Sequence, residues 1–63
     1  MALSSKRLGN RQAAQYIGVA AQSLNNMRHH GRGPDYIKIG RKVLYDTKDL
    51  DRFLDTNRVK LSA

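Results

Sequence analysis

Residues 12–33 read QAAQYIGVAAQSLNNMRHHGRG, and this stretch decides the fold. Its first apolar residues have the spacing of one helical face: Ala13, Ala14 and Ile17. The spacing predicts a helix that runs to about Ile17, with Gly9 or Asn10 as its N-cap. Gly18 then ends the helix, because glycine enters the left-handed conformation without steric cost.

A second helix follows after a very short connection. We expect it to run from about Ala21 to His29, with Leu24 and Met27 facing inward. The connection is too tight for an ordinary antiparallel helix pair, and the small residue Ala14 lets the two backbones approach closely. This geometry is a helix-turn-helix, and its predicted apolar set is Ala13, Ala14, Ile17, Val19, Leu24 and Met27.

The outward face of the second helix carries uncharged hydrogen-bonding residues, one cation and one imidazole: Gln22, Ser23, Asn25, Asn26, Arg28 and His29. Asparagine and glutamine match adenine, arginine matches guanine, and each bidentate contact gives about 1–3 kcal/mol of discrimination. The face therefore predicts a recognition helix that contacts bases or phosphates of DNA. An ordinary polar helix face is the alternative, although Lys and Glu, its usual residues, are absent here.

His29 and His30 do not indicate a metal site, because adjacent helical residues point about 100° apart and the sequence has no further His and no Cys. Near a helix C-terminus the pair suits contacts with terminal carbonyl groups or with phosphate. Gly31 is expected to cap the helix, and Gly33 and Pro34 are expected to lead into an extended segment.

A hairpin is predicted next, in residues 36–45 (YIKIGRKVLY), with its turn at Gly40. A three-residue loop, residues 40–42, places the apolar side chains on one face: Ile37, Ile39, Val43 and Tyr45. A two-residue loop instead sets Ile39 opposite Lys42. We favour the three-residue loop because it keeps the apolar residues together.

A third helix closes the predicted core. Asp46 or Thr47 is its N-cap, Asp49 lies in its first turn, and its apolar residues recur at i, i+3 and i+4: Leu50, Phe53 and Leu54. From Asn57 on, the sequence is a polar tail that is either disordered or ordered by a partner. The chain thus divides into a flexible basic arm (1–8), one domain (9–55) and the polar tail (56–63).

The net charge of +7 is unevenly distributed. Residues 1–45 hold eight Lys and Arg and one acid, Asp35, whereas residues 46–63 hold four basic and four acidic residues. This asymmetry predicts a polyanion-binding face, because each neutralised phosphate releases counterions; a solvated, solubilising surface is the alternative. The candidate phosphate contacts are Lys38, Arg41 and Lys42 of the hairpin, and also Lys6, Arg7, Arg11 and Arg32. Protection of an edge strand is the alternative for the hairpin charges.

The length of 63 residues allows one domain, which buries only about 60% of the surface of its unfolded chain. No apolar run approaches the roughly 18 residues of a membrane span, and no signal peptide is evident, so we expect a soluble, intracellular protein. Cys is absent and Ser23 has no recognisable catalytic partners. We expect neither enzymatic activity nor a cofactor or metal.

The chain closely resembles the excisionase-type DNA-binding domains, also called AlpA-like, which are related to the winged-helix heads of MerR-type regulators. The resemblance covers about Leu8 to Leu54, and its most specific parts are AAQYIGV (13–19), Leu24 and GRGPDYIKIGRKVLYDTKDLDRFL (31–54). It implies a winged helix-turn-helix, mainly α with a small β-hairpin. In that fold the second helix enters the major groove, and the hairpin is a wing in the minor groove.

Two residues depart from the pattern of that family. Ala20 stands where Ser or Thr usually caps the second helix, a change that typically costs about 1 kcal/mol, and Met27 stands where an aromatic residue is common. The sequence also lacks the dimerisation coiled coil of MerR-type sensors, so no small-molecule ligand is expected.

Three functions are compatible with these observations. The first is an excisionase of a phage or other mobile genetic element, which binds and bends attachment-site DNA and directs an integrase toward excision. Its partners in the bacterial cytoplasm would be double-stranded DNA, further copies bound cooperatively head to tail, and the integrase, with no membrane involved. The second is an AlpA-like transcription regulator at a promoter, and the sequence does not separate these two. The third is a protein-interaction module that does not bind DNA.

Overall fold

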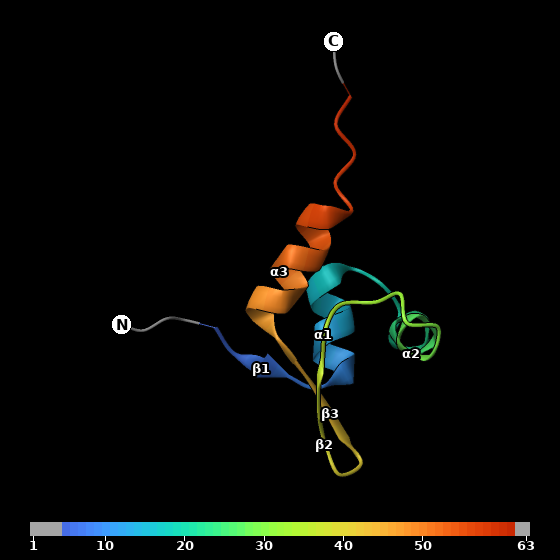
Figure 1. Ribbon diagram of the computed structural model, residues 1–63, viewed down its shortest axis with the longest axis vertical. Helices are drawn as coiled ribbons and strands as arrows, with labels where there is room; N and C mark the ends of the chain where they lie inside the picture. The colour runs from blue at the N-terminus through green and yellow to red at the C-terminus, as the bar shows by residue number, and fades with distance from the viewer. Residues whose placement is uncertain (1–4, 62–63) are drawn as a thin grey trace.

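The computed structural model describes residues 5–61, which form three helices and a three-stranded antiparallel sheet. The elements follow the chain as β1 (Arg7–Leu8), α1 (Asn10–Ile17), α2 (Ala21–His29), β2 (Ile37–Ile39), β3 (Lys42–Asp46) and α3 (Thr47–Thr56). In Figure 1, α1 and α3 lie side by side, and α2 is seen nearly end-on beside them. The β2–β3 hairpin extends downward, away from the C-terminal end of α3. This confirms the predicted winged helix-turn-helix, and the hairpin is hereafter called the wing.

The turn between α1 and α2 depends on Gly18, whose φ of +83° is left-handed. The N–H groups of Gly18 and Val19 both donate to the carbonyl oxygen of Ala14, at 2.8 and 2.9 Å. Ala14 itself is 1% exposed, so a larger side chain there would push the helices apart. These contacts confirm the tight connection expected from the sequence. At the other end of α1, Gly9 and not Asn10 is the N-cap, and its carbonyl oxygen accepts the N–H of Ala13 at 2.9 Å.

The core takes residues from every helix and from the sheet. The fully buried apolar residues are Ala13, Ala14, Leu24, Tyr45 and Leu50. Partly buried residues pack against them: Leu8, Ile17, Val19, Ala21, Met27 and Val43. The apolar set predicted for the helix-turn-helix is therefore confirmed, and Tyr45 and Leu50 join it from the wing and α3. Leu54, which was predicted to face the core with Leu50, is 39% exposed.

The wing has a two-residue turn, so the favoured three-residue loop was wrong. Ile39 is opposite Lys42, and Lys38 is opposite Val43. The turn closes at Gly40, whose φ of +59° suits the first residue of a type II′ turn. Because cross-strand partners share a face, Lys38 lies on the same side as Val43 and Tyr45, and Ile39 lies on the other side, 61% exposed. The wing therefore has the register that buries Tyr45, although the same register leaves Ile39 exposed to solvent.

Strand β1 is a second correction, because residues 1–8 were expected to be a flexible arm. Arg7 is opposite Asp46 and Leu8 is opposite Tyr45, which puts β1 on the edge of β3 away from β2. Residues 1–4 of the expected arm lie outside the described residues. The backbone of Lys6 is also paired, since its carbonyl oxygen accepts the N–H of Thr47 at 2.8 Å and its N–H donates to the hydroxyl of Thr47 at 3.0 Å.

Helix α3 begins as predicted, with Asp46 as N-cap accepting the N–H of Lys48 at 3.2 Å. The hydroxyl of Tyr16 on α1 donates to Asp51 of α3 at 2.7 Å, and this hydrogen bond raises the pKa of Tyr16 above its usual value. After α3, residues 58–61 have no regular secondary structure, and Leu61 is 91% exposed.

No helix within residues 5–61 is long and apolar enough to cross a membrane.

Leu24→Ala is expected to lower the free energy of unfolding by about 2–5 kcal/mol, because Leu24 is fully buried and its removal leaves a cavity under α2. Leu54→Ala is the matched control at an exposed position, with an expected loss of about 1 kcal/mol or less. Urea denaturation followed by circular dichroism measures both. Equal losses in the two variants would contradict this placement of the core.

Ala20→Ser is expected to raise the free energy of unfolding by about 1 kcal/mol. Ala20 is the N-cap of α2, its backbone is extended (φ −70°, ψ 149°), and its side chain makes no capping hydrogen bond. A serine hydroxyl can accept one of the free N–H groups of the first turn. Ala21→Ser, one residue inside the helix, is the control and should give no gain in the same urea titration. A gain of equal size from Ala21→Ser would argue against capping as the cause.

Candidate nucleic-acid interface

The structure divides the six predicted recognition residues of α2 into two groups. Four are exposed: Gln22, Ser23, Asn26 and His29. The other two, Asn25 and Arg28, are partly buried. The expectation that all six face outward is therefore wrong for Asn25 and Arg28. Base contacts by the exposed four stay a prediction.

Arg28 is held by three other residues of the chain. Its Nη1 donates to Asn10 Oδ1 at 3.0 Å and to the hydroxyl of Tyr45 at 2.9 Å, and its Nη2 donates to Asn25 Oδ1 at 3.0 Å. The guanidinium carbon lies 5.9 Å from the centre of the Tyr36 ring, close enough for a cation–π contact. The Tyr36 and Tyr45 rings are themselves in tilted contact, with centroids 6.1 Å apart. The end of α2 is thus joined to α1 and to the wing.

No signal in the sequence identifies the two distant partners of Arg28, Asn10 and Tyr45. Asn10 was considered only as a helix cap, yet its side chain accepts from Arg28 and donates to the carbonyl oxygen of Ala21 at 3.4 Å. Tyr45 was predicted only as an apolar wing residue. These contacts join residues 11 to 18 positions apart, which no local periodicity reports.

A cleft of about 490 Å³ separates the end of α2 from the wing, and we call it the α2–wing cleft. Its lining residues are Arg28, His29, Tyr36, Lys38, Gly40, Arg41 and Val43. Lys38 and Arg41 therefore lie across the cleft from α2. Lys42, the third predicted wing contact, has the opposite orientation, because it shares a face with Ile39. No acidic residue is among the lining residues in the described part of the chain.

The four predicted backbone contacts outside the wing are exposed but do not gather at this cleft: Lys6, Arg7, Arg11 and Arg32. Lys6 and Arg7 lie beside the start of α3 through their pairing with residues 46 and 47. Arg11 is in the first turn of α1. Arg32 lines a different groove, of about 360 Å³, between the α2–β2 connection and α3.

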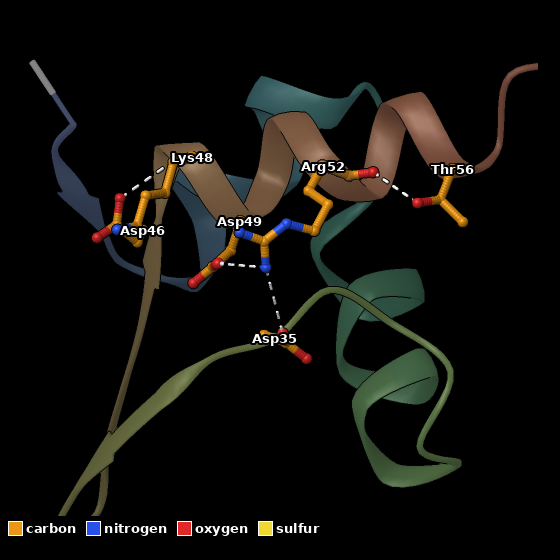
Figure 2. A network of polar contacts seen from close by, with 6 residues as sticks. All are labelled: Asp35, Asp46, Lys48, Asp49, Arg52 and Thr56. Carbon is orange, nitrogen blue, oxygen red and sulfur yellow. Dashed lines mark hydrogen bonds and ion pairs between the residues drawn. The ribbon is translucent and has the colours of Figure 1, made fainter.

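Asp35, the acid of the basic half of the chain, lies against α3. Figure 2 shows Arg52 of α3 between two carboxylates, with its Nη1 3.9 Å from Asp35 and 3.5 Å from Asp49. Exposed ion pairs of this kind contribute little stability, about 0–1 kcal/mol. Asp35 lines the α3 groove and also a hollow that it shares with Arg28 and Tyr36, but it is not among the residues that line the α2–wing cleft.

The two histidines do not come together as ligands. His29 is exposed at the α2–wing cleft, whereas Nδ1 of His30 lies 2.7 Å from the carbonyl oxygen of Asn26, the terminal-carbonyl contact predicted for this pair. Among residues 5–61, no cluster of three or more His, Asp or Glu could hold a metal ion.

The model of a protein family described as a helix-turn-helix domain matches residues 8–58 of the chain. No curated protein matches the chain. The matched range contains α1, α2, the wing and α3, and it confirms the resemblance that the sequence motifs indicated. Proteins of this family bind DNA through the helix-turn-helix and are of a non-catalytic kind.

Arg41→Ala is expected to weaken binding equally to DNA duplexes selected for tight binding and to duplexes of random sequence, because a phosphate contact carries no sequence information. The slope of log affinity against log salt concentration should fall by about one unit. Lys48→Ala, which removes an exposed cation from α3, is the matched control and should leave the slope unchanged. Fluorescence anisotropy over a salt series measures both slopes. An unchanged slope in Arg41→Ala would remove the wing tip from the interface.

Proposed function

The chain belongs to the helix-turn-helix domain family, and on that premise we propose that it is an excisionase. In this proposal it recognises specific sequences in attachment-site DNA, binds them in several adjacent copies and bends the duplex. The bent complex then directs a site-specific integrase toward excision. The strand exchange is chemistry of the integrase, so the proposed role needs no catalytic residue and no cofactor in this chain.

The proposal is supported above all by the α2–wing cleft. Arg28, His29, Lys38 and Arg41 line it, and the described lining contains no acid. The adjoining face of α2 exposes Gln22, Ser23 and Asn26, whose amide and hydroxyl groups suit base edges. A cationic cleft beside an uncharged hydrogen-bonding helix is the combination that reads a duplex, because phosphate contacts position the protein and base contacts specify the sequence.

The energetics of bending favour several copies over one. Bending a site of 20–30 base pairs by 40–90° costs on the order of 1–6 kcal/mol. A domain of this size offers only a few phosphate contacts, and Lys6, Arg7 and Arg32 lie away from the α2–wing cleft. Adjacent copies share the cost of the bend and add contacts with one another. We therefore include cooperative head-to-tail binding in the proposal.

The test is to recover fragments from sheared DNA of the source genome with tagged protein at near-physiological salt, and to sequence them. The excisionase proposal predicts enrichment of tandem repeats beside an attachment site. The double variant Gln22→Ala, Asn26→Ala is the control, because both side chains are exposed and their loss should abolish enrichment without unfolding the protein.

Three other outcomes contradict parts of the proposal. Enrichment of a single promoter-proximal site would identify a transcription regulator of the AlpA kind. No enrichment over random fragments would leave either non-specific architectural DNA binding or a protein-interaction module. Binding curves on multi-site DNA that show independent sites would remove the cooperative step.

A further inference from the structure

We propose that Arg28 is a positioning residue, which fixes the orientation of α2 against α1 and the wing, and that base recognition falls to Gln22, Ser23 and Asn26. The inference deepens the proposed function and rests on α2 being the helix that reads DNA. It reverses the expectation from the sequence, in which Arg28 was itself a candidate for guanine.

The donors of Arg28 are largely occupied within the chain. A guanidinium group has five N–H donors, of which two are on Nη1. Nη1 makes two hydrogen bonds, to Asn10 and to Tyr45, and Nη2 makes one to Asn25. A bidentate contact with guanine needs two free donors along one edge of the group. The edge formed by Nη1 and Nη2 is already in use, and Nε–H and one Nη2–H remain. The positioning role therefore rests on these three hydrogen bonds and not on a lack of donors.

The contacts of Arg28 add polar links at the C-terminal end of α2, where Met27 also packs against the core. Helix α2 packs mainly against α1, and its one fully buried residue is Leu24. Its N-terminal end is fixed by the turn at Gly18 and by the hydrogen bond from Asn10 to the carbonyl oxygen of Ala21. One full turn beyond Leu24, the side chain of Arg28 reaches Tyr45 of β3 and the ring of Tyr36. These contacts are the link between α2 and the wing.

This link matters for recognition because the groups that read a base must be held to within about 0.5 Å of their productive positions. Asn26 lies two residues before Arg28, and Gln22 and Ser23 lie about one turn earlier on the same helix. A rotation of α2 about the Gly18 turn would displace all three together. Loss of Arg28 should therefore reduce the preference at every base pair that α2 reads.

Tyr45→Phe separates positioning from direct readout. Tyr45 is 0% exposed, so any effect of its hydroxyl on DNA selectivity must be transmitted through Arg28. We expect Tyr45→Phe to reduce the ratio of affinities for selected over random duplex by about tenfold, the lower end of what one hydrogen bond to a charged group contributes. Tyr16→Phe is the matched control, because it removes an exposed tyrosine hydrogen bond to Asp51 and should leave the ratio unchanged.

Variants of Arg28, combined with Tyr45→Phe, form a double-mutant cycle. Arg28→Ala and Arg28→Lys should each lose selectivity across all base pairs read by α2, because lysine keeps the charge but not the planar fork. Tyr45→Phe should add nothing further in the Arg28→Ala background, since both act through one interaction. The inference is overturned if Arg28→Ala relaxes preference at a single base pair while Tyr45→Phe keeps wild-type selectivity. Full selectivity in Arg28→Lys would overturn it as well.

A measurement without DNA keeps this inference separate from the proposed function. In free, isotopically labelled protein, the guanidinium signals of Arg28 should be slow to exchange with water, and residual dipolar couplings should show α2 reorienting relative to α1 in Tyr45→Phe. The couplings of α3 should not change, and Tyr16→Phe should match the wild type for α2. Freely exchanging Arg28 signals, or an unchanged α2 orientation, would refute the positioning role even if the protein binds DNA as proposed.

Discussion

Tyr45 is the residue on which the rest of the structure depends. It is the largest fully buried side chain, and it lies in the core with Leu24 of α2, Leu50 of α3 and the two alanines of α1. Its burial fixes which face of the wing points inward and hence the register of β2 on β3. Its buried hydroxyl has a hydrogen-bond partner, because it accepts from Arg28. One side chain therefore determines both the packing of the domain and the link between α2 and the wing.

Much of the fold could be predicted because its signals are local. The spacing of Ala13, Ala14 and Ile17, the glycine at position 18 and the cap at Asp46 correctly indicated the helices and their ends. The wing register and strand β1 were not predictable in the same way. Collecting all apolar residues on one face favoured a three-residue loop, whereas the three-dimensional core needs only Val43 and Tyr45. Strand β1 pairs with residues about 40 positions away, and two residues carry no periodicity of their own.

The candidate site was predictable where it depends on composition and not where it depends on contacts. The charge asymmetry, the uncharged face of α2 and the basic wing are properties of residue types, and the sequence displays them directly. Whether a polar side chain faces solvent or a neighbour is decided by tertiary structure. Arg28 is four residues after the buried Leu24, so helical periodicity sets it toward the core side of α2, whereas Asn26 and Gln22 point away from it. The particular partners of Arg28 on other elements, Asn10 and Tyr45, are decided by tertiary structure.

The groove beside α3 and the α2–wing cleft differ in charge and in the function that we propose for them. Helix α3 and the groove beside it hold Asp35, Asp49 and Arg52 in exposed ion pairs, whereas the α2–wing cleft has cationic residues on both of its walls. The two regions are separated because α3 and α2 pack on different sides of α1 (Figure 1). DNA is therefore expected on one side of the domain, and the α3 side is left open.

The most direct test of this account is a titration of labelled protein with a short DNA duplex, followed by amide chemical shifts. The account predicts that the largest changes occur at Gln22 and Asn26, on the exposed face of α2, and at Arg41, in the α2–wing cleft. The amides of Asp51 and Asp55 on α3 should change little. The largest changes along α3, with α2 unaffected, would contradict the assignment of the DNA-binding face.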